Sequence, residues 1–506
     1  MRSKNSYKNI LAVGIAQAVS LMLNFLYRSV IIKTLGIEYL GVNGLFTNIL
    51  SILSMANLGL GSAITFALYK PIAEKDINQT KALMNFYLMI YRIIGIVIFI
   101  VGCLLIPTLP YLIKGNHSIV NIELLYILFV TDSAISYFFI YKSSYINANQ
   151  KNYITTYITY AFHIMLILFQ VAILMIYKNF MFSIVLKVVF TFLTNYFTAI
   201  YANKKYPEIK NIKGYKLLPE DRNDIFKNVL ALIIYRVSGV ATQGMSSIVI
   251  SAFVGIIETG IISNYQMIVL ALSNMLNAAY NSILSIVGNL HVTESKEHNI
   301  YIFNVMFLIT SWIFGVVSIS LFVLIRPFIT LWLGASFVID SWTVLFIILN
   351  FYVIGMQQVS RTFRNAMGLF RYGRFRPLFT SIVSTLLSIL LVKLIGVAGI
   401  FIAVFIAHVT TTVWYDPYIV FVKGFGVSPK QYYISYIRYL TITICMGFLI
   451  YWLLGFFKSI NIANFITMVI VDISILNIIY FVVFMRTSEF RYFINNIKQN
   501  LLNKKE

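Results

Sequence analysis

The sequence predicts an all-α, polytopic membrane protein of about 14 transmembrane helices, with two six-helix lobes in parallel repeat and two additional C-terminal helices. Composition, recurring apolar segments and an internal repeat predict this fold class. Of the 506 residues, 59% are hydrophobic and 11% are charged, and the mean hydropathy is +0.84; an average soluble domain has about 25% charged residues. Apolar stretches of about 20 residues recur along the chain, each long enough to cross ~30 Å of hydrocarbon.

In chain order, the apolar stretches predict transmembrane spans, with ends defined to within several residues. They lie near 10–32, 42–69, 83–106, 122–141, 154–177, 180–201, 228–254, 262–286, 300–325, 342–360, 377–395, 398–420, 439–457 and 462–485. The first span lacks a small-residue cleavage site and leads directly into the second. We therefore expect a retained helix rather than a removed signal peptide.

The basic charge follows the predicted topology. The chain carries 39 Lys and Arg and a net charge of +22, and most of these cations lie on the segments that are cytoplasmic if the amino terminus is cytoplasmic. This asymmetry is the positive-inside rule, and it predicts a multi-pass protein with both termini in the cytoplasm. It also accounts for the positive charge without a nucleic-acid partner.

No motif for a metal, a cofactor or an enzymatic nucleophile is found. Cys103 and Cys445 lie in separate apolar spans, and the five His lack metal-ligand spacing. Neither a Gly-rich phosphate loop nor a nucleophile motif is present. The sequence therefore indicates a protein that is not an enzyme and has no cofactor.

An internal repeat relates the two lobes. Shifted by 219 positions, residues 8–41 align without a gap with residues 227–260, and ten of the 34 columns are identical. Asn147-Ala148 matches Asn365-Ala366 at an offset of 218, and Pro110 matches Pro327 at 217. One near-constant offset therefore persists from the first span to the end of the fourth.

The repeat predicts the domain organisation. We expect an N-terminal six-helix lobe at 1–201, a cytoplasmic linker at 202–226, a C-terminal six-helix lobe at 227–421, and two further helices with a basic tail at 422–506. Lobes with an even number of spans enter the membrane in the same orientation. Transporters built from such parallel repeats bind substrate between the halves near the midplane.

Polar residues form one face of the first span. Gln17, Asn24 and Arg28 recur at helical spacing among apolar residues. An arginine within a span costs roughly 2.5 to 3.5 kcal/mol on insertion scales, so it usually faces a partner or a water-filled cavity. The alternative for Arg28 is that it snorkels to the nearby interface.

The second lobe repeats this polar face with different residues. Shifted by 219, Gln17 becomes Arg236 and Asn24 becomes Gln243. Both lobes therefore open with a helix that carries a polar stripe and one arginine. This shared feature favours a cavity lined by the two stripes, with Gln17, Asn24, Arg28, Arg236 and Gln243 as candidate substrate-binding residues.

A basic run follows the tenth span. Residues 361–376 hold five arginines, which fit a positive-inside anchor near anionic headgroups. The alternative is capture of a lipid phosphate from the cytoplasmic leaflet, for which Arg361 and Arg364 are the candidates because they share a helical face. The C-terminal tail has the pattern of a basic amphipathic helix on the membrane surface.

Cations outnumber acids within the predicted bundle. In addition to Arg28 and Arg236, the cations Arg92 and Lys187 lie inside spans, whereas Asp132 and Asp472 are the clear acids. This excess favours an anionic cargo, and arginine suits phosphate because its planar fork bonds two oxygens at once. Asp132 is a weak candidate for binding a coupling ion.

The chain resembles the polysaccharide flippase branch of the MOP superfamily, the Wzx-type exporters. The resemblance rests on residues 8–46, on "IRPFITLWLG" (325–334), on "RNAMGLFRYGR" (364–374) and on the layout of six, six and two spans. It implies a bacterial plasma-membrane protein that moves an undecaprenyl-diphosphate-linked oligosaccharide between leaflets by alternating access, for surface polysaccharide synthesis. Family members place an arginine on the first helix, here Arg28. A polysaccharide polymerase and glycosyltransferases are the implied partners, beside membrane lipids.

Other functions remain open on the sequence alone. A cation-coupled exporter of drugs or of another lipid precursor shares the superfamily, and it would depend on acids such as Asp132. A membrane polymerase or ligase usually needs a large outer loop, which the short predicted outer segments do not provide. A scaffold without transport activity would leave two costly polar stripes unexplained.

Overall fold

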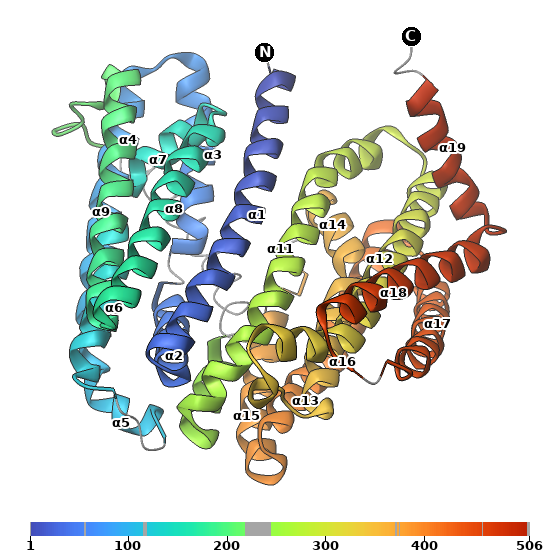
Figure 1. Cartoon of the computed structure of the whole chain (residues 1–506). Coiled ribbons are helices and arrows are strands. Elements are labelled where there is room, and N and C mark those ends of the chain that lie inside the picture. Colours follow the sequence, from blue (N-terminus) through green and yellow to red (C-terminus); the bar gives the residue numbers. More distant parts are fainter. Residues whose placement is uncertain are drawn as a thin grey trace. The chain divides into compact units, whose positions relative to one another are not determined.

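The computed structural model describes residues 2–54, 57–114, 119–217, 244–369, 372–373, 375–457 and 459–502. The regular structure of these residues is helical, and eleven of their helices are long and apolar enough to cross a membrane. The predicted all-α polytopic class is therefore confirmed. The chain divides into two compact units, Met1–Ser263 and Asn264–Glu506, and Figure 1 colours the helices in chain order.

Unit 1 consists of long helices joined by short turns. Its elements are α1 (Arg2–Thr34), α2 (Ile37–Leu53), α3 (Asn57–Glu74), α4 (Ile77–Leu104), η2 (Ile106–Thr108), α5 (Leu109–Leu112), α6 (Ile122–Ser136), α7 (Ile140–Ala148), α8 (Asn152–Tyr177), α9 (Phe180–Lys205), η3 (Pro207–Ile209) and the π-helical turn η4 (Ile250–Val254). The first residues of α11 (Ile256–Thr293) also belong to this unit.

Two apolar clusters form the core of unit 1. One joins α1, α2 and α6 through residues such as Ile31, Phe46 and Phe129, and it includes Ile256 at the start of α11. The other is rich in tyrosine and joins α4, α7 and α9 around Tyr87 and Tyr145. The first cluster holds α1 in a fixed register through Val30 and Ile31, which positions its polar face.

Unit 2 has the same construction. Its elements are the remainder of α11, α12 (Lys296–Trp332), η5 (Ala335–Phe337), α13 (Ser341–Met356), α14 (Gln358–Ala366), α15 (Arg376–Ile395), α16 (Val397–Tyr418), η7 (Ile419–Phe425), α17 (Lys430–Leu454), α18 (Ile462–Phe484) and α19 (Ser488–Leu502). Phe303 of α12 contacts the rings of Phe363, Phe421 and Tyr432 at centroid distances of 5.0 to 5.9 Å. This cluster fixes α14, η7 and the start of α17 against α12.

The helix boundaries repeat at the offset that the sequence predicts. Asp76 is the N-cap of α4 and Ser295 is the N-cap of α12, 219 positions later. Asn121 and Asp340, at the same offset, are the N-cap residues of α6 and α13. Helices α7 and α14 each have nine residues and differ by 218 positions. The repeat is therefore present in the backbone as well as in the residue identities.

Three predicted spans each contain two helices. The span 42–69 holds parts of α2 and α3. In the span 122–141, α6 ends at Ser136 before α7 begins at Ile140, and in the span 342–360, α13 ends at Met356 before α14 begins at Gln358. The last two pairs still form one candidate membrane span each, Ile122–Ala148 and Ser341–Ala366. Hydropathy reports only that a segment is apolar, so an interruption of one to three residues inside it goes undetected. The boundary between the units also lies within α11, beyond the predicted linker; the domain boundaries themselves stay a prediction.

Candidate functional site

Arg28 lies within unit 1 on the half-buried face of α1. Its Nη1 donates a hydrogen bond of 2.8 Å to Oγ of Ser263 on α11, and that hydroxyl donates to the carbonyl oxygen of Gly260 at 2.7 Å. Arg28 lies six residues before the end of α1 at Thr34. The guanidinium therefore reaches across to another helix of the unit and has a defined position there.

The rest of the polar face joins α1 to α8. Asn24 donates from Nδ2 to the carbonyl oxygen of Ser20 at 2.8 Å and to its Oγ at 3.4 Å. Oγ of Ser20 lies 3.3 Å from Nε2 of His163. Gln17 is half-buried on the same helix, about one turn before Ser20. The structure thus brings Asn24 together with two polar residues that the sequence analysis did not select.

Ser20 and His163 were missed for different reasons. Ser20 follows Gln17 by three residues and precedes Asn24 by four, so helical spacing alone could have added it to the stripe. His163 lies on α8, 143 positions from Ser20. Nothing in the local sequence links these two residues.

The crossing beside Arg28 depends on glycines of the repeat. A Cβ added to Gly41 would lie 2.1 Å from the carbonyl oxygen of Ile256, and one added to Gly260 would lie 2.7 Å from that of Ile37. These two contacts are equivalent under the offset of 219, because Gly41 corresponds to Gly260 and Ile37 to Ile256. The repeated segments therefore meet at matching positions, and only glycine allows their backbones to approach so closely.

Two of the predicted site residues, Arg236 and Gln243, lie outside the described residues. Ser247, which corresponds to Arg28 in the repeat, is described: Asn48 of α2 donates to its Oγ at 3.0 Å. Both Arg28 and its repeat partner therefore make polar contacts at the same crossing.

Arg361 and Arg364 converge on one buried carboxylate in unit 2. Nη1 of Arg364 lies 2.6 Å from Oδ1 of Asp416, and Nε of Arg361 lies 3.9 Å from Oδ2. Nη1 of Arg376 pairs with the same Oδ2. Asp416 is fully buried, Arg364 is 2% exposed, Arg376 is 10% exposed and Arg361 is 28% exposed. Three guanidinium groups therefore share the carboxylate of Asp416.

This arrangement separates the roles of the two predicted arginines. The shared face of Arg361 and Arg364 is present, but Arg364 is enclosed and held by Asp416, whereas Arg361 retains access to its surroundings. Asp416 was not selected from the sequence. The signal for it was an acid inside a predicted span in a chain with only 17 Asp and Glu.

Asp132 is part of an ion pair in unit 1. Its Oδ2 lies 3.1 Å from Nζ of Lys187, and its Oδ1 accepts a 2.6 Å hydrogen bond from Thr191. Lys187 also lies over the ring of Phe129, 4.8 Å from the centroid. The carboxylate is thus neutralised by a neighbouring cation. Within the described part of the chain, no group of three or more His, Cys, Asp or Glu is placed to hold a metal ion.

Solved structures with the same fold are transporters of the membrane. The lipid II flippase MurJ, in an inward closed conformation, matches with a TM-score of 0.70 and 17% identity over 94% of this chain and all of that chain. An inward-facing multidrug resistance MATE family transporter of the MOP superfamily matches with a TM-score of 0.62 and 15% identity over 82% of this chain and 99% of that one.

A MATE transporter of Vibrio cholerae also matches, with a TM-score of 0.57 and 13% identity over 83% of this chain and 98% of that one. No family model matches the chain, and no curated protein matches it in sequence. At these identities, the comparisons establish the fold.

Proposed function

We propose that this protein is a flippase that moves an undecaprenyl-diphosphate-linked oligosaccharide from the cytoplasmic to the outer leaflet of a bacterial plasma membrane. The cargo serves surface polysaccharide synthesis, which implies glycosyltransferases that build it and a polymerase that consumes it. Similarity to a lipid II flippase over 94% of the chain supports this proposal. The flippase branch is also the one that the sequence resembles.

One observation carries the proposal: an arginine lies on the polar face of the first helix, where an apolar membrane helix has no need of charge. Arg28 donates to the hydroxyl of Ser263, and its guanidinium gives this polar face a positive charge that suits an anionic cargo. A guanidinium binds a diphosphate through two parallel hydrogen bonds.

The remaining polar face suits the sugar part of the cargo. Gln17, Ser20 and Asn24 precede Arg28 along the same face of α1, and each offers a hydroxyl or amide that exchanges hydrogen bonds with sugar hydroxyls. The prenyl chain stays in the bilayer, because moving it into a polar cavity has no energetic gain. Alternating access then presents the same residues to either leaflet.

The flippase proposal is tested directly with proteoliposomes. Purified protein is reconstituted with an undecaprenyl-diphosphate-linked oligosaccharide, and the fraction that becomes accessible to an added glycosidase is followed over time. Arg28→Gln should slow translocation about tenfold or more, since a hydrogen bond to a charged group contributes about 1.5–3 kcal/mol. Arg28→Lys should retain part of the rate because the charge remains.

A matched control separates the site from general loss of charge. Arg326→Gln removes an exposed arginine of α12 that donates to Ser341, and it should translocate at the wild-type rate. Equal rates for Arg28→Gln and Arg326→Gln would contradict the role of Arg28. In cells, deletion of the gene should cause lipid-linked sugar to accumulate on the cytoplasmic side.

The alternative of a cation-coupled drug exporter makes a different prediction. Such transport would depend on an acid that is free to bind the cation, whereas Asp132 is paired with Lys187. Drug resistance that is lost with Asp132→Asn and kept with Arg28→Gln would favour this alternative over the flippase.

A further inference from the structure

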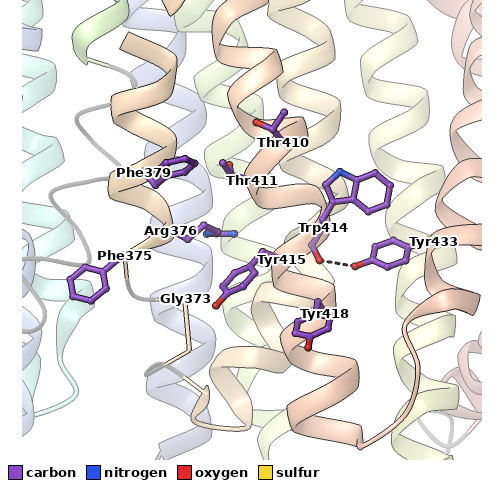
Figure 2. A pocket seen from close by; sticks show the side chains of 10 residues that line it. All are labelled: Gly373, Phe375, Arg376, Phe379, Thr410, Thr411, Trp414, Tyr415, Tyr418 and Tyr433. Carbon is purple, nitrogen blue, oxygen red and sulfur yellow. Dashed lines mark hydrogen bonds between the residues drawn. The ribbon is translucent and has the colours of Figure 1, made fainter. Parts of the chain in front are cut away.

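A groove of about 700 Å³ opens on unit 2, beside the arginine cluster and outside the site described for Arg28. Its walls come from α15, α16 and the beginning of α17 (Figure 2). Helices α15 and α16 form a tight antiparallel pair, in which the hydroxyls of Thr380 and Thr411 lie 2.7 Å apart. The groove therefore has a rigid floor with hydroxyl groups in it.

One cation reaches the groove. Arg376 extends from the start of α15 toward α16, between Thr411 and Tyr415 (Figure 2). Its side chain is nine-tenths buried and pairs with Asp416, yet its Nε donates to no acceptor among the described residues. Arg376 shares Asp416 with Arg361 and Arg364. A phosphate in the groove would give Arg376 a second anionic partner.

Aromatic side chains surround this cation and face outward. Phe375 is 57% exposed, Phe379 60%, Trp414 50% and Tyr418 45%, and all four line the groove. They lie where α15 begins and α16 ends, the end of these helices that the Lys and Arg distribution assigns to the cytoplasm. Aromatic residues at helix ends are typical of the membrane interface, where headgroups meet acyl chains.

We propose that this groove binds the headgroup phosphate of an anionic bilayer phospholipid from the cytoplasmic leaflet. The phosphate is held by Arg376, and the acyl chains lie along Phe379 and Trp414. A guanidinium provides two donors in the geometry that a phosphate diester accepts. The site is independent of the transport proposal, because it serves a resident lipid rather than the cargo.

The chemistry of the walls favours a phospholipid over an oligosaccharide-bearing lipid. Thr411 is already committed, since its hydroxyl lies 2.5 Å from the carbonyl oxygen of Ala407 and 2.7 Å from Thr380. The hydroxyl of Tyr433 donates to the carbonyl oxygen of Trp414 at 2.7 Å. The hydroxyl of Thr410 likewise donates to the carbonyl oxygen of Ile406 at 2.8 Å. These committed hydroxyls offer little to an oligosaccharide, whereas a guanidinium suffices for a phosphate diester.

The test measures lipid retention by the full-length protein. The protein is incorporated into nanodiscs of phosphatidylcholine with a minor fraction of phosphatidylglycerol, and the lipids that stay bound after mild extraction are counted by native mass spectrometry. Wild-type protein should retain phosphatidylglycerol over phosphatidylcholine by about fivefold, the effect of one basic side chain near a membrane surface. Arg376→Gln should abolish this preference.

Two further variants keep the result interpretable. Thr410→Trp fills the groove from an exposed position and leaves the arginine cluster intact, so it should also abolish the preference even if Arg376→Gln fails to fold. Arg326→Gln removes an exposed arginine elsewhere in unit 2, and this variant should retain the preference for phosphatidylglycerol. Equal retention of both lipids by the wild type, or an unchanged preference in Thr410→Trp, would overturn the proposal.

A competition arm distinguishes the source of the phosphate. Addition of an undecaprenyl diphosphate at a concentration equal to that of phosphatidylglycerol should leave the bound phosphatidylglycerol in place. Displacement at this concentration would assign the groove to the cargo and overturn the assignment to a resident phospholipid. Loss of translocation in Arg28→Gln with an unchanged lipid preference would separate the two sites.

Discussion

Asp416→Asn should strongly destabilise unit 2. The substitution keeps the size and the hydrogen-bonding capacity of the side chain and removes the one negative charge that faces three guanidinium groups. Asp416 is fully buried and Arg364 is 2% exposed, with 2.6 Å between Oδ1 and Nη1. Removing one member of such a buried ion pair costs about 3–5 kcal/mol, because the other charge stays in a medium of low dielectric.

The three arginines contribute unequally to this cost. Arg361 is 28% exposed and lies 3.9 Å from the carboxylate, so solvent screens it and its share is small. Arg376 is 10% exposed and has the groove beside it, into which its guanidinium can turn. Most of the loss therefore comes from Arg364, and we expect about 3 kcal/mol for Asp416→Asn, the lower end of the range.

The assay is reversible unfolding of the purified protein by sodium dodecyl sulfate in mixed micelles. A double-mutant cycle with Arg364→Met isolates the pair: the double variant should be more stable than the sum of the single losses predicts, by at least about 1 kcal/mol. Asp76→Asn is the matched control, because asparagine caps a helix as well as aspartate does, and it should change stability by less than about 0.5 kcal/mol. A loss below about 1 kcal/mol for Asp416→Asn, or strict additivity in the cycle, would refute the reasoning.

Two further substitutions test contacts within unit 1. Gly41→Ala forces a Cβ against the carbonyl oxygen of Ile256 and should cost about 1–3 kcal/mol in the same unfolding assay. Gly44→Ala, where the nearest atom is 3.6 Å away, should cost nothing and should raise stability by up to about 1 kcal/mol, because alanine favours a helix over glycine; equal losses would contradict the close approach. Lys187→Gln should cost about 1–3 kcal/mol because it leaves the carboxylate of Asp132 without its 3.1 Å ion pair, and adding Asp132→Asn should restore most of that stability. A double variant no more stable than Lys187→Gln would show that the pair has no such role.

The sequence predicts the helices well because each signal for them is local. About 20 apolar residues define a span wherever they occur. The internal repeat adds a second, independent comparison for each boundary. What stays hidden is a short interruption, as at Gln357 between α13 and α14, since the residues around it are as apolar as those of a continuous helix.

The arginine cluster shows where prediction from sequence ends. Arg361 and Arg364 share a face of α14, which spacing alone reveals. Their counter-ion, Asp416, is 52 positions from Arg364 and lies on α16, so nothing in either segment indicates the pair. The cost of burying a charge only says that some partner exists; the fold decides which one. For the same reason, the sequence does not distinguish Arg376 from the other arginines of the run 361–376. Only the structure shows that Arg376 lines a groove.

The repeated glycines are visible in the sequence, but the structural reason for each of them is not. Gly36 and Gly41 recur as Gly255 and Gly260, and the turn they predict is present, with Gly36 at a φ of 103° before α2 begins. A turn explains Gly36 but does not explain Gly41. Gly41 lies inside α2, where glycine costs roughly 1 kcal/mol relative to alanine. The contacts with Ile256 and, at the equivalent position, of Gly260 with Ile37 supply the reason. The two copies of the repeated segment contact each other, and they do so next to Arg28, the residue on which the proposed transport depends.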